Sequence, residues 1–268
     1  MKIYFEVIFC VVTYKNTEDI KEFIQSVKNL DFSYKIIIVN NYCDEESKKI
    51  IESIAKNNGC DFINSKNNGY GAGNNIAIRY ALEEYDFNYL VVTNPDIIIR
   101  SFKINNIPNI DGVFAPRIST FSGKQQNPMC LYDSKLYNYL VFNGFKRGNK
   151  FILYIGIVFN KIIRILVSRY KKFSRKAFYK IYMAHGSFVV FPYKIVAEIK
   201  VMYDEKMFLF AEESFLAWKL KKMGIRTYYT ECIQVLHKED GSMRFRNDLD
   251  TQLSKANLYF YSSYYFNK

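Results

Sequence analysis

The sequence predicts an α/β protein in which a mainly parallel β-sheet is flanked by helices. Over residues 4–93, short continuous apolar runs alternate with longer segments whose apolar residues recur at helical spacing. Continuous apolar strands are typical of a parallel sheet that helices cover on both faces. Polar side chains directly follow several of these strands, and ligands bind at the carboxyl ends of the strands in such sheets.

The first third of the chain contains the clearest elements. Strands are predicted at residues 4–12, 35–39, 61–64 and 89–93, and helices at residues 17–30, 45–57 and 76–85. Thr17 is predicted to cap the first helix, because Glu18 and Asp19 follow in its first turn. A glycine-rich loop is predicted at residues 66–75, before the third helix.

The pattern is less regular after Pro116. A strand is predicted at residues 188–191, a helix at 212–223, and two late strands at 226–229 and 232–236. Gly224 marks the end of the helix. The tail, residues 253–266, has a helical pattern and is rich in tyrosine.

The composition predicts one well-packed protein of the cytoplasm. The chain has 268 residues, of which 49% are apolar, and this is enough for a buried core. The five cysteines form no CxxC pair, so we expect reduced thiols in a cytosolic compartment. There is no apolar run of about 18 residues to predict a transmembrane helix, and the apolar N-terminal run lacks a signal-peptide cleavage site.

The net charge of +12 comes mainly from one segment. Residues 134–197 contain thirteen of the 38 Lys and Arg residues and no Asp or Glu. Apolar residues there recur at helical spacing, and basic residues fall on the opposite face: Ile155, Phe159, Ile162, Leu166, Phe173 and Ala177 against Lys161, Arg164, Lys171, Lys172 and Arg175. This basic amphipathic pattern predicts a peripheral protein on the inner face of the cell membrane, with residues 151–180 on the anionic surface.

The aromatic tail is predicted to reach the same membrane interface, since Tyr and Phe recur from Tyr259 to Phe266. Two alternatives for the basic segment are a helix that packs on the core and a contact within a homodimer.

Two turns that follow predicted strands could hold a ligand. NNGYGAGNN, residues 67–75, places three glycines before a helix, where backbone N–H groups can approach a phosphate. An ordinary turn that caps the helix fits this loop equally well. In the second turn, Pro95 stiffens the chain and presents the carboxylate of Asp96, which could hold Mg²⁺ or Mn²⁺ together with diphosphate oxygens. A simple turn aspartate has the same pattern.

Two further residues have places that suit chemistry. Glu213 shares the apolar face of its helix with Leu216 and Leu220, and a carboxylate on an inward face needs a partner or a role such as general base. His237 ends an apolar strand, where a histidine can bind a metal or a phosphate. The alternatives are a first-turn acid favoured by the helix dipole and a structural histidine.

In their order along the chain, VVTY, NNGYGAGNN, TNPD, HGSFVVF, FLFAEESFLAWKLKKMG and VLHKEDGS resemble the bacterial family 2 glycosyltransferases, in particular their rhamnosyltransferase-like branch. The resemblance covers about residues 5–242. It implies a GT-A domain at residues 1–242, with residues 134–182 as a basic helical insertion and residues 243–268 as an aromatic-rich tail. It also implies a metal-dependent, inverting hexosyl- or rhamnosyltransferase of cell-surface polysaccharide synthesis.

The resemblance assigns roles by position. Glu213 corresponds to the catalytic base, and Asp96 and His237 correspond to the residues that hold Mg²⁺ or Mn²⁺. Gly186 and Glu212 fall on the acceptor side. The implied donor site contains Thr13, Tyr14, Asn40, Asn68, Gly69, Gly71, Asn74, Asn94 and Asp96.

The implied partners are a UDP-, dTDP- or GDP-linked sugar donor and a glycan or lipid-linked acceptor. The chain departs from the family pattern at Asn40, where Asp is usual, and at Phe215, where a further acid is usual. A nucleotidyltransferase is one alternative, but VVTYKNTED has no glycines after the first strand. A nucleic-acid-binding protein that uses residues 134–197 is another. It leaves Asp96, Glu213 and His237 unexplained, so we expect no nucleic acid partner.

Overall fold

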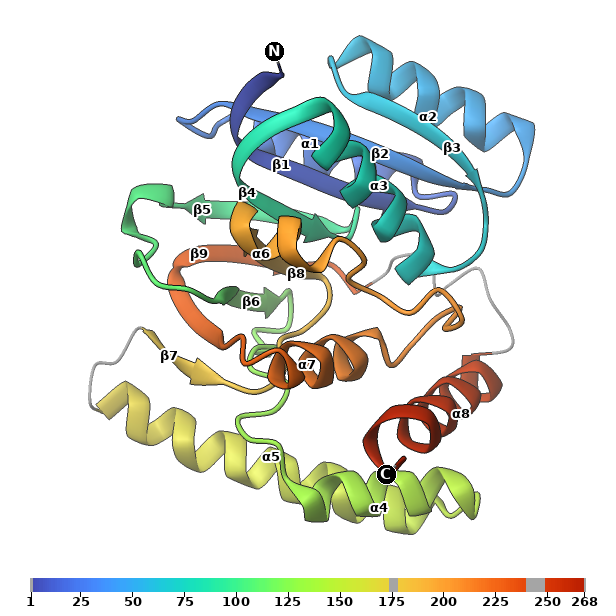
Figure 1. Cartoon of the computed structure of the whole chain (residues 1–268), viewed down its shortest axis with the longest axis vertical. Coiled ribbons are helices and arrows are strands. Elements are labelled where there is room, and N and C mark those ends of the chain that lie inside the picture. Colours follow the sequence, from blue (N-terminus) through green and yellow to red (C-terminus); the bar gives the residue numbers. More distant parts are fainter. Residues whose placement is uncertain (1, 174–177, 240–248, 268) are drawn as a thin grey trace.

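The computed structural model describes residues 2–173, 178–239 and 249–267. These residues form one nine-stranded sheet in the order β3-β2-β1-β4-β8-β6-β9-β5, and β7 pairs with β9 (Figure 1). The strands are β1 (Ile3–Thr13), β2 (Tyr34–Tyr42), β3 (Asp61–Lys66), β4 (Tyr85–Thr93), β5 (Ile97–Phe102), β6 (Val113–Thr120), β7 (Phe178–Ile181), β8 (Phe188–Pro192) and β9 (Thr227–His237).

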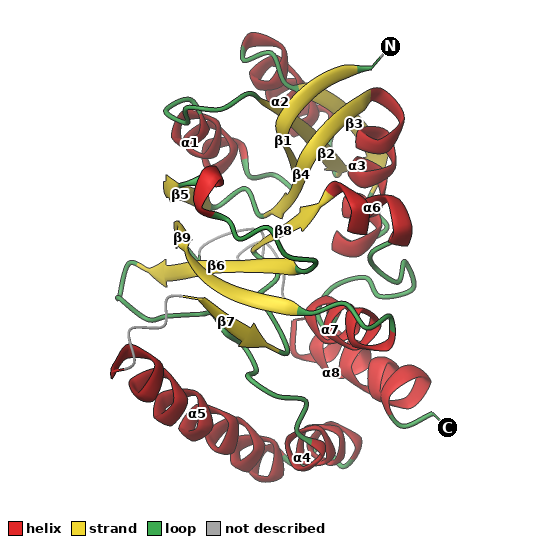
Figure 2. Cartoon of the chain, turned by 60° about the vertical axis from the view of Figure 1, so that its left-hand side comes forward, coloured by secondary structure: helices red, strands yellow, loops and turns green. Residues whose placement is uncertain are grey.

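Helices cover both faces of this sheet. They are α1 (Thr17–Val27), α2 (Glu45–Asn57), α3 (Tyr70–Glu84), α4 (Lys135–Lys146), α5 (Lys150–Phe173), α6 (Tyr193–Ile199), α7 (Glu212–Lys222) and α8 (Leu249–Phe260). Figure 2 shows α1 and α2 on one side of the sheet and α3 and α6 on the other. Each side has its own apolar core, because successive strand residues point to opposite faces.

The predicted fold is confirmed: strands β1 to β4 are parallel, and mixed pairing begins at β8. β9 is parallel to β6, and β6 and β4 are both antiparallel to β8. The carboxyl ends of β4 and β9 therefore lie at the same edge of the sheet. The turn 94–96 connects β4 to β5 at this edge, where Ile97 pairs with His237.

Besides shifts of up to four residues at element ends, such as the end of α1 and the start of β4, three local predictions differ from the structure. Asn16, not Thr17, occupies the N-cap position of the first helix, without a side-chain capping hydrogen bond, and its amide donates to the Asp19 carboxylate at 2.9 Å. The third helix begins at Tyr70 rather than at residue 76. The two late strands are one strand, β9, because its pairing with β6 continues through a register shift.

The third helix begins early because its glycines allow close packing. Gly69 has φ +104°, and a Cβ there would lie 2.2 Å from the carbonyl oxygen of Phe208. The amide N–H of Tyr70 donates to that same oxygen at 3.0 Å. A Cβ on Gly71 would lie 2.9 Å from the Cβ of Tyr203. The loop that precedes α7 is thereby held against the start of α3.

Replacing Gly69 with Ala is expected to lower the free energy of unfolding by at least about 2 kcal/mol, because strain and a backbone clash add together. Gly59 is the matched control, since it also has positive φ (+66°) but has open space where an added Cβ would lie. Gly59→Ala is expected to cost about 1 kcal/mol. Urea denaturation of both variants measures the difference, and equal losses would contradict the packing role of Gly69.

The aromatic tail, predicted to reach a membrane interface, packs most of its rings against the protein. Its membrane contact stays a prediction. Phe260 and Tyr261 are fully buried in a cluster with α4 and α7. The hydroxyl of Tyr265 donates to Asp133 at 2.6 Å, and that of Tyr259 donates to Asp204 at 2.9 Å. Buried aromatic rings whose hydroxyls find partners contribute to packing. The tail therefore stabilises the protein core.

The basic segment forms a helical hairpin of α4 and α5, followed by β7, which joins the main sheet. The structure describes α5 as a helix to Phe173, so the predicted helical positions up to Ala177 lie partly outside the described residues. Among the described residues, no helix is long and apolar enough to cross a membrane.

Candidate functional site

A cavity of about 320 Å³ lies at the sheet edge where β4 and β9 end. Six of the predicted site residues line it: Asn94, Asp96, Gly186, Glu212, Glu213 and His237. The lining residues that the prediction does not include are Val12, Tyr70, Pro95, Gln126, His185, Ser187, Leu209, Phe210 and Glu239. The fold therefore brings the predicted base and the predicted metal-binding pair into one cavity.

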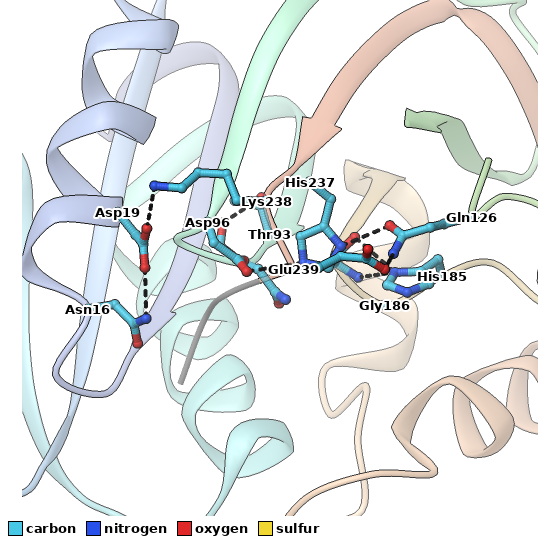
Figure 3. A network of polar contacts seen from close by, with 12 residues as sticks. Asn16, Asp19, Thr93, Asp96, Gln126, His185, Gly186, His237, Lys238 and Glu239 are labelled. Atoms are coloured by element: carbon cyan, nitrogen blue, oxygen red, sulfur yellow. Dashed lines mark hydrogen bonds and ion pairs between the residues drawn. The ribbon is translucent and has the colours of Figure 1, made fainter. Parts of the chain in front are cut away.

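Asp96 and His237 face each other in this cavity. Both side chains are buried, and Asp96 Oδ2 lies 3.2 Å from His237 Nε2. The backbone N–H of Lys238 donates to the Asp96 carbonyl at 3.0 Å, and the Lys238 ammonium pairs with Asp19 of α1 at 2.7 Å. Lys238 thus ties the end of β9 to both the 94–96 turn and α1 (Figure 3).

Gln126 fixes the orientation of the His237 ring. Its amide nitrogen donates to Glu239 at 2.7 Å, so its oxygen, 2.8 Å from His237 Nδ1, accepts a hydrogen bond from that nitrogen (Figure 3). His237 Nε2 is then the nitrogen that faces Asp96. A bare imidazole nitrogen beside a carboxylate is unfavourable unless a proton or a cation lies between them. The pair is therefore suited to bind a cation.

His185 forms another wall of the same cavity. Its Nδ1 accepts from the backbone N–H of Ser187 at 3.2 Å, and its ring centroid lies 5.5 Å from that of His237. Burial, and then the nearby His237, lower the pKa of His185 to about 3. A neutral ring adds no positive charge next to the Asp96–His237 pair.

Glu212 and Glu213 begin α7 after two strained residues. Phe210 and Ala211 both have positive φ, at +72° and +64°, although neither is glycine. Such conformations cost about 1–3 kcal/mol each and persist only where the surrounding structure enforces them. This turn aims both carboxyls into the cavity.

The two carboxyls have different surroundings. Glu213 Oε1 accepts from the backbone N–H of Gly186 at 3.4 Å, and a Cβ on Gly186 would lie 2.8 Å from that oxygen. Glu212 Oε1 is buried and has no hydrogen-bond partner among the described residues. Burial raises the pKa of Glu213, and burial together with the charge of Glu213 raises the pKa of Glu212 to about 8.

Glu212 is expected to make stability depend on pH. Its folded-state pKa of about 8 lies above the ordinary value of 4.5, so the folded state keeps a proton that the unfolded state loses. The free energy of unfolding should therefore fall as pH rises between these two values. Relative to wild type, Glu212→Gln should become more stable by a few kcal/mol over that range. Urea denaturation across pH measures this, and parallel pH profiles would contradict it.

The predicted donor residues outside the cavity lie at the ends of β1 and β2 and at the start of α3. Thr13 Oγ1 and Asn74 Oδ1 are buried and have no hydrogen-bond partner among the described residues. Asn40 donates to Asn64 across the strands at 2.8 Å. Asn68 is exposed, and the Tyr14 hydroxyl lies 3.5 Å from Cys43 Sγ. The donor roles of these residues stay predictions.

The glycines of the 67–75 loop have a packing role in the structure. Gly69 and Gly71 contact residues 203–208, and the amide of Tyr70 is already bonded within the protein. The amide of Gly73 is likewise bonded, to the carbonyl of Gly69 at 3.1 Å. Their part in binding a phosphate stays a prediction.

Gln126 is a cavity residue that no sequence pattern indicates, and Tyr70 lies in the predicted glycine-rich loop but has no role assigned to it from the sequence. Gln126 comes from an irregular segment without periodicity, and the Tyr70 hydroxyl reaches the cavity because it donates to the carbonyl of Gly186 at 3.3 Å. Glu239 has a sequence signal that could have been used, because it lies two residues after His237, in the polar loop that follows β9.

Comparison with known proteins shows which proteins the chain is similar to. Residues 8–101 match the model of glycosyl transferase family 2. The rhamnosyltransferase WbbL of Escherichia coli (strain K12) is 25% identical over 85% of this chain and 81% of its own length. The low-salt glycan biosynthesis hexosyltransferase Agl10 of Haloferax volcanii is 22% identical over 96% of this chain and 76% of its own length.

Solved structures share the fold at low sequence identity. GalNAc-T7 with UDP, GalNAc and Mn²⁺ has a TM-score of 0.57 and 11% identity, and the match covers 87% of this chain but 43% of that chain. S. aureus TarS residues 1–349 with UDP-GlcNAc has a TM-score of 0.54 and 14% identity, covering 92% of this chain and 62% of that chain. The solved structures confirm the predicted fold, and the match to the family 2 glycosyltransferase model covers residues 8–101.

Proposed function

We propose that this chain, whose residues 8–101 match the family 2 glycosyltransferase model, transfers a hexosyl or rhamnosyl group from a nucleotide-sugar donor to a hydroxyl of a glycan or lipid-linked acceptor. The transfer inverts the anomeric carbon. The observation that carries this proposal is the single cavity in which Glu213 shares a wall with Asp96 and His237.

The metal-ligating side chains of the cavity fit a divalent cation. Among the described residues, no three His, Cys, Asp or Glu side chains gather closely enough to bind a metal alone. Asp96 Oδ2 and His237 Nε2 supply two ligands on one side, 3.2 Å apart. Mg²⁺ is commonly held by one or two carboxylates together with substrate phosphates. When bound there, Mg²⁺ or Mn²⁺ would neutralise the charge of the donor diphosphate.

Glu213 acts as the general base in this proposal. It accepts the proton of the acceptor hydroxyl while that oxygen forms a bond to C1 of the donor sugar. The bond from C1 to the diphosphate oxygen breaks in the same step, so the configuration inverts. The Gly186 amide, 3.4 Å from Glu213 Oε1, positions the carboxylate, and burial raises its pKa, which makes the ionised form a stronger base.

Glu212 stays neutral at pH 7 in this arrangement, since its pKa is about 8. Two neighbouring carboxyls in different surroundings can take different catalytic roles. Glu212 can then donate a hydrogen bond to the acceptor, and its orphaned Oε1 can accept one. This supports the acceptor-side role of Glu212 and Gly186.

A donor screen tests the proposed function. UDP-, dTDP- and GDP-sugars are added with Mg²⁺, with Mn²⁺ or with EDTA, and the Tm of the protein is measured. One donor class is expected to raise the Tm by several degrees in the presence of a divalent ion and much less with EDTA. If none of the three classes raises the Tm, the nucleotide-sugar proposal is wrong.

A further inference from the structure

The outward side of α5 is apolar. Phe151, Tyr154, Ile155, Ile162, Ile165 and Leu166 recur at spacings of three, four and seven residues, and we call these six residues the outer α5 face. All of them are exposed, and Phe151 and Leu166 expose 71% and 60% of their surface. The face extends roughly 22 Å along the helix. Contiguous exposed apolar surface of this kind marks an interaction site.

The inward side of α5 is fixed by contacts with the protein. A Cβ on Gly144 of α4 would lie 2.9 Å from Leu153, and a Cβ on Gly156 would lie 3.2 Å from Leu140. The Asn160 amide donates to the carbonyl of Met129 at 2.9 Å. The close contacts at Gly144 and Gly156 and the Asn160 hydrogen bond fix the rotation of α5 about its own axis. The outer α5 face therefore points to solvent because of the fold.

Arg164 is the one described cation of α5 that contacts the protein body, whereas Lys150 and Lys161 are exposed. Its guanidinium donates to the carbonyls of Gln125 and Gln126, both at 3.3 Å. The outer α5 face points away from the domain, whereas Leu153, Ile163 and Val167 of the same helix pack against the protein. Lys171, Lys172 and Arg175 lie outside the residues whose side chains the structure describes.

Exposed cations lie on the same hairpin as the outer α5 face. Five basic residues of the hairpin are exposed: Lys135, Lys146, Arg147, Lys150 and Lys161. Residues 134–197 contain no Asp or Glu to balance them. Figures 1 and 2 both place the α4–α5 hairpin at the end of the molecule away from α1 and α2, so the domain leaves this surface uncovered.

We propose that the outer α5 face and the exposed cations of its hairpin bind an anionic phospholipid bilayer, with α5 lying in the plane of the headgroups. Apolar side chains flanked by lysine and arginine are the combination that holds a helix at this depth. A second copy of the chain fits less well, because a twofold contact of this face with itself would place like charges together. This proposal goes beyond the proposed function, and its test does not depend on the donor or on activity.

Vesicle sedimentation tests the proposal with the full chain. Vesicles of phosphatidylglycerol and phosphatidylcholine are compared with vesicles of phosphatidylcholine alone. The protein is expected to sediment with the anionic vesicles at low salt and to be released as salt rises. Lys150→Gln and Lys161→Gln are each expected to weaken binding by about fivefold. A protein that stays in the supernatant with anionic vesicles at low salt would overturn the proposal.

A matched pair of variants tests the apolar part. Phe151 and Phe121 expose 71% and 70% of their surfaces, but Phe121 lies outside the hairpin. Phe151→Asn combined with Leu166→Asn is expected to reduce vesicle binding by about tenfold or more, and Phe121→Asn to leave it unchanged. If the double variant and Phe121→Asn changed vesicle binding equally, the assignment of binding to the outer α5 face would be wrong.

Two further experiments test other ligands of this face. Size-exclusion chromatography with light scattering detects a second copy of the chain, and a gel shift detects RNA. If the wild type forms a dimer that Phe151→Asn/Leu166→Asn dissociates, and neither protein binds vesicles, the face contacts a second copy and the lipid proposal is wrong. If the wild type binds RNA but not vesicles, and the double variant no longer binds RNA, the face contacts RNA and the lipid proposal is wrong. Donor-induced stabilisation of the same samples is measured separately, so either proposal can fail while the other holds.

Discussion

Replacing Glu213 with Gln is expected to lower kcat by about 10²–10⁴-fold, because a glutamine cannot accept the proton of the acceptor hydroxyl. The fold should be retained, since the amide is nearly isosteric and its oxygen can still accept from Gly186. Stabilisation by the donor should also be retained, because Glu213 is proposed to act on the acceptor. The measurement is release of nucleoside diphosphate from the donor at saturating acceptor.

Glu212→Gln is the informative comparison for this prediction. Glu212 is expected to be neutral at pH 7, with its pKa of about 8, so an amide there mimics the native state and should cost much less activity. If Glu212→Gln loses as much kcat as Glu213→Gln, the assignment of the base to Glu213 alone is wrong.

The pH dependence of kcat gives a second test of this assignment. Because burial raises the pKa of Glu213, kcat of the wild type should rise with pH above the ordinary 4.5, and this rise should disappear in Glu213→Gln.

The parallel half of the sheet could be predicted because its signals are local. β1, β2 and β4 contain continuous apolar runs, β3 contains only the pair Phe62 and Ile63, and α2 begins and ends where its periodicity places it. The predicted start of α3 is six residues late, because glycines lower helix propensity when considered alone. In the structure, Gly71 and Gly73 are needed there for contact with Tyr203 and Val12. Tertiary packing outweighs local preference at this point.

The sequence predicts individual residues of the site but not the contacts between them. Asp96, Glu213 and His237 stand out by their places after strands or on a helix face, and the fold brings them to one cavity. The pairing of Gln126 with His237 joins segments that are 111 positions apart, and no periodicity indicates it. Helical spacing also identifies the two sides of α5 without telling which one meets the protein. That choice depends on Gly144 and Gly156, which bring α4 against one side.

Replacing Asp96 with Asn is expected to remove divalent-ion binding, because the amide supplies a neutral oxygen in place of the carboxylate that faces His237 Nε2 at 3.2 Å. The loss in Mn²⁺ affinity should exceed the roughly 10–100-fold that removal of a supporting residue costs. Calorimetric titration of Mn²⁺ in the presence of the nucleoside diphosphate measures it without turnover. Donor stabilisation should then no longer depend on the metal.

Two further variants show whether the loss of Mn²⁺ affinity is specific to Asp96. Gln126→Met keeps both proposed ligands but removes the acceptor of His237 Nδ1, which lies at 2.8 Å, so it should weaken Mn²⁺ binding by about 10–100-fold. Asp111→Asn removes an exposed carboxylate that pairs with Lys194, and Mn²⁺ affinity should not change. If Asp96→Asn binds Mn²⁺ as tightly as Asp111→Asn does, then Asp96 is a turn residue and the cation, if one is used, is held elsewhere. A graded series with Asp96→Asn weakest would mean that the rigid Asn94-Pro95-Asp96 turn exists to hold one carboxylate against the end of β9.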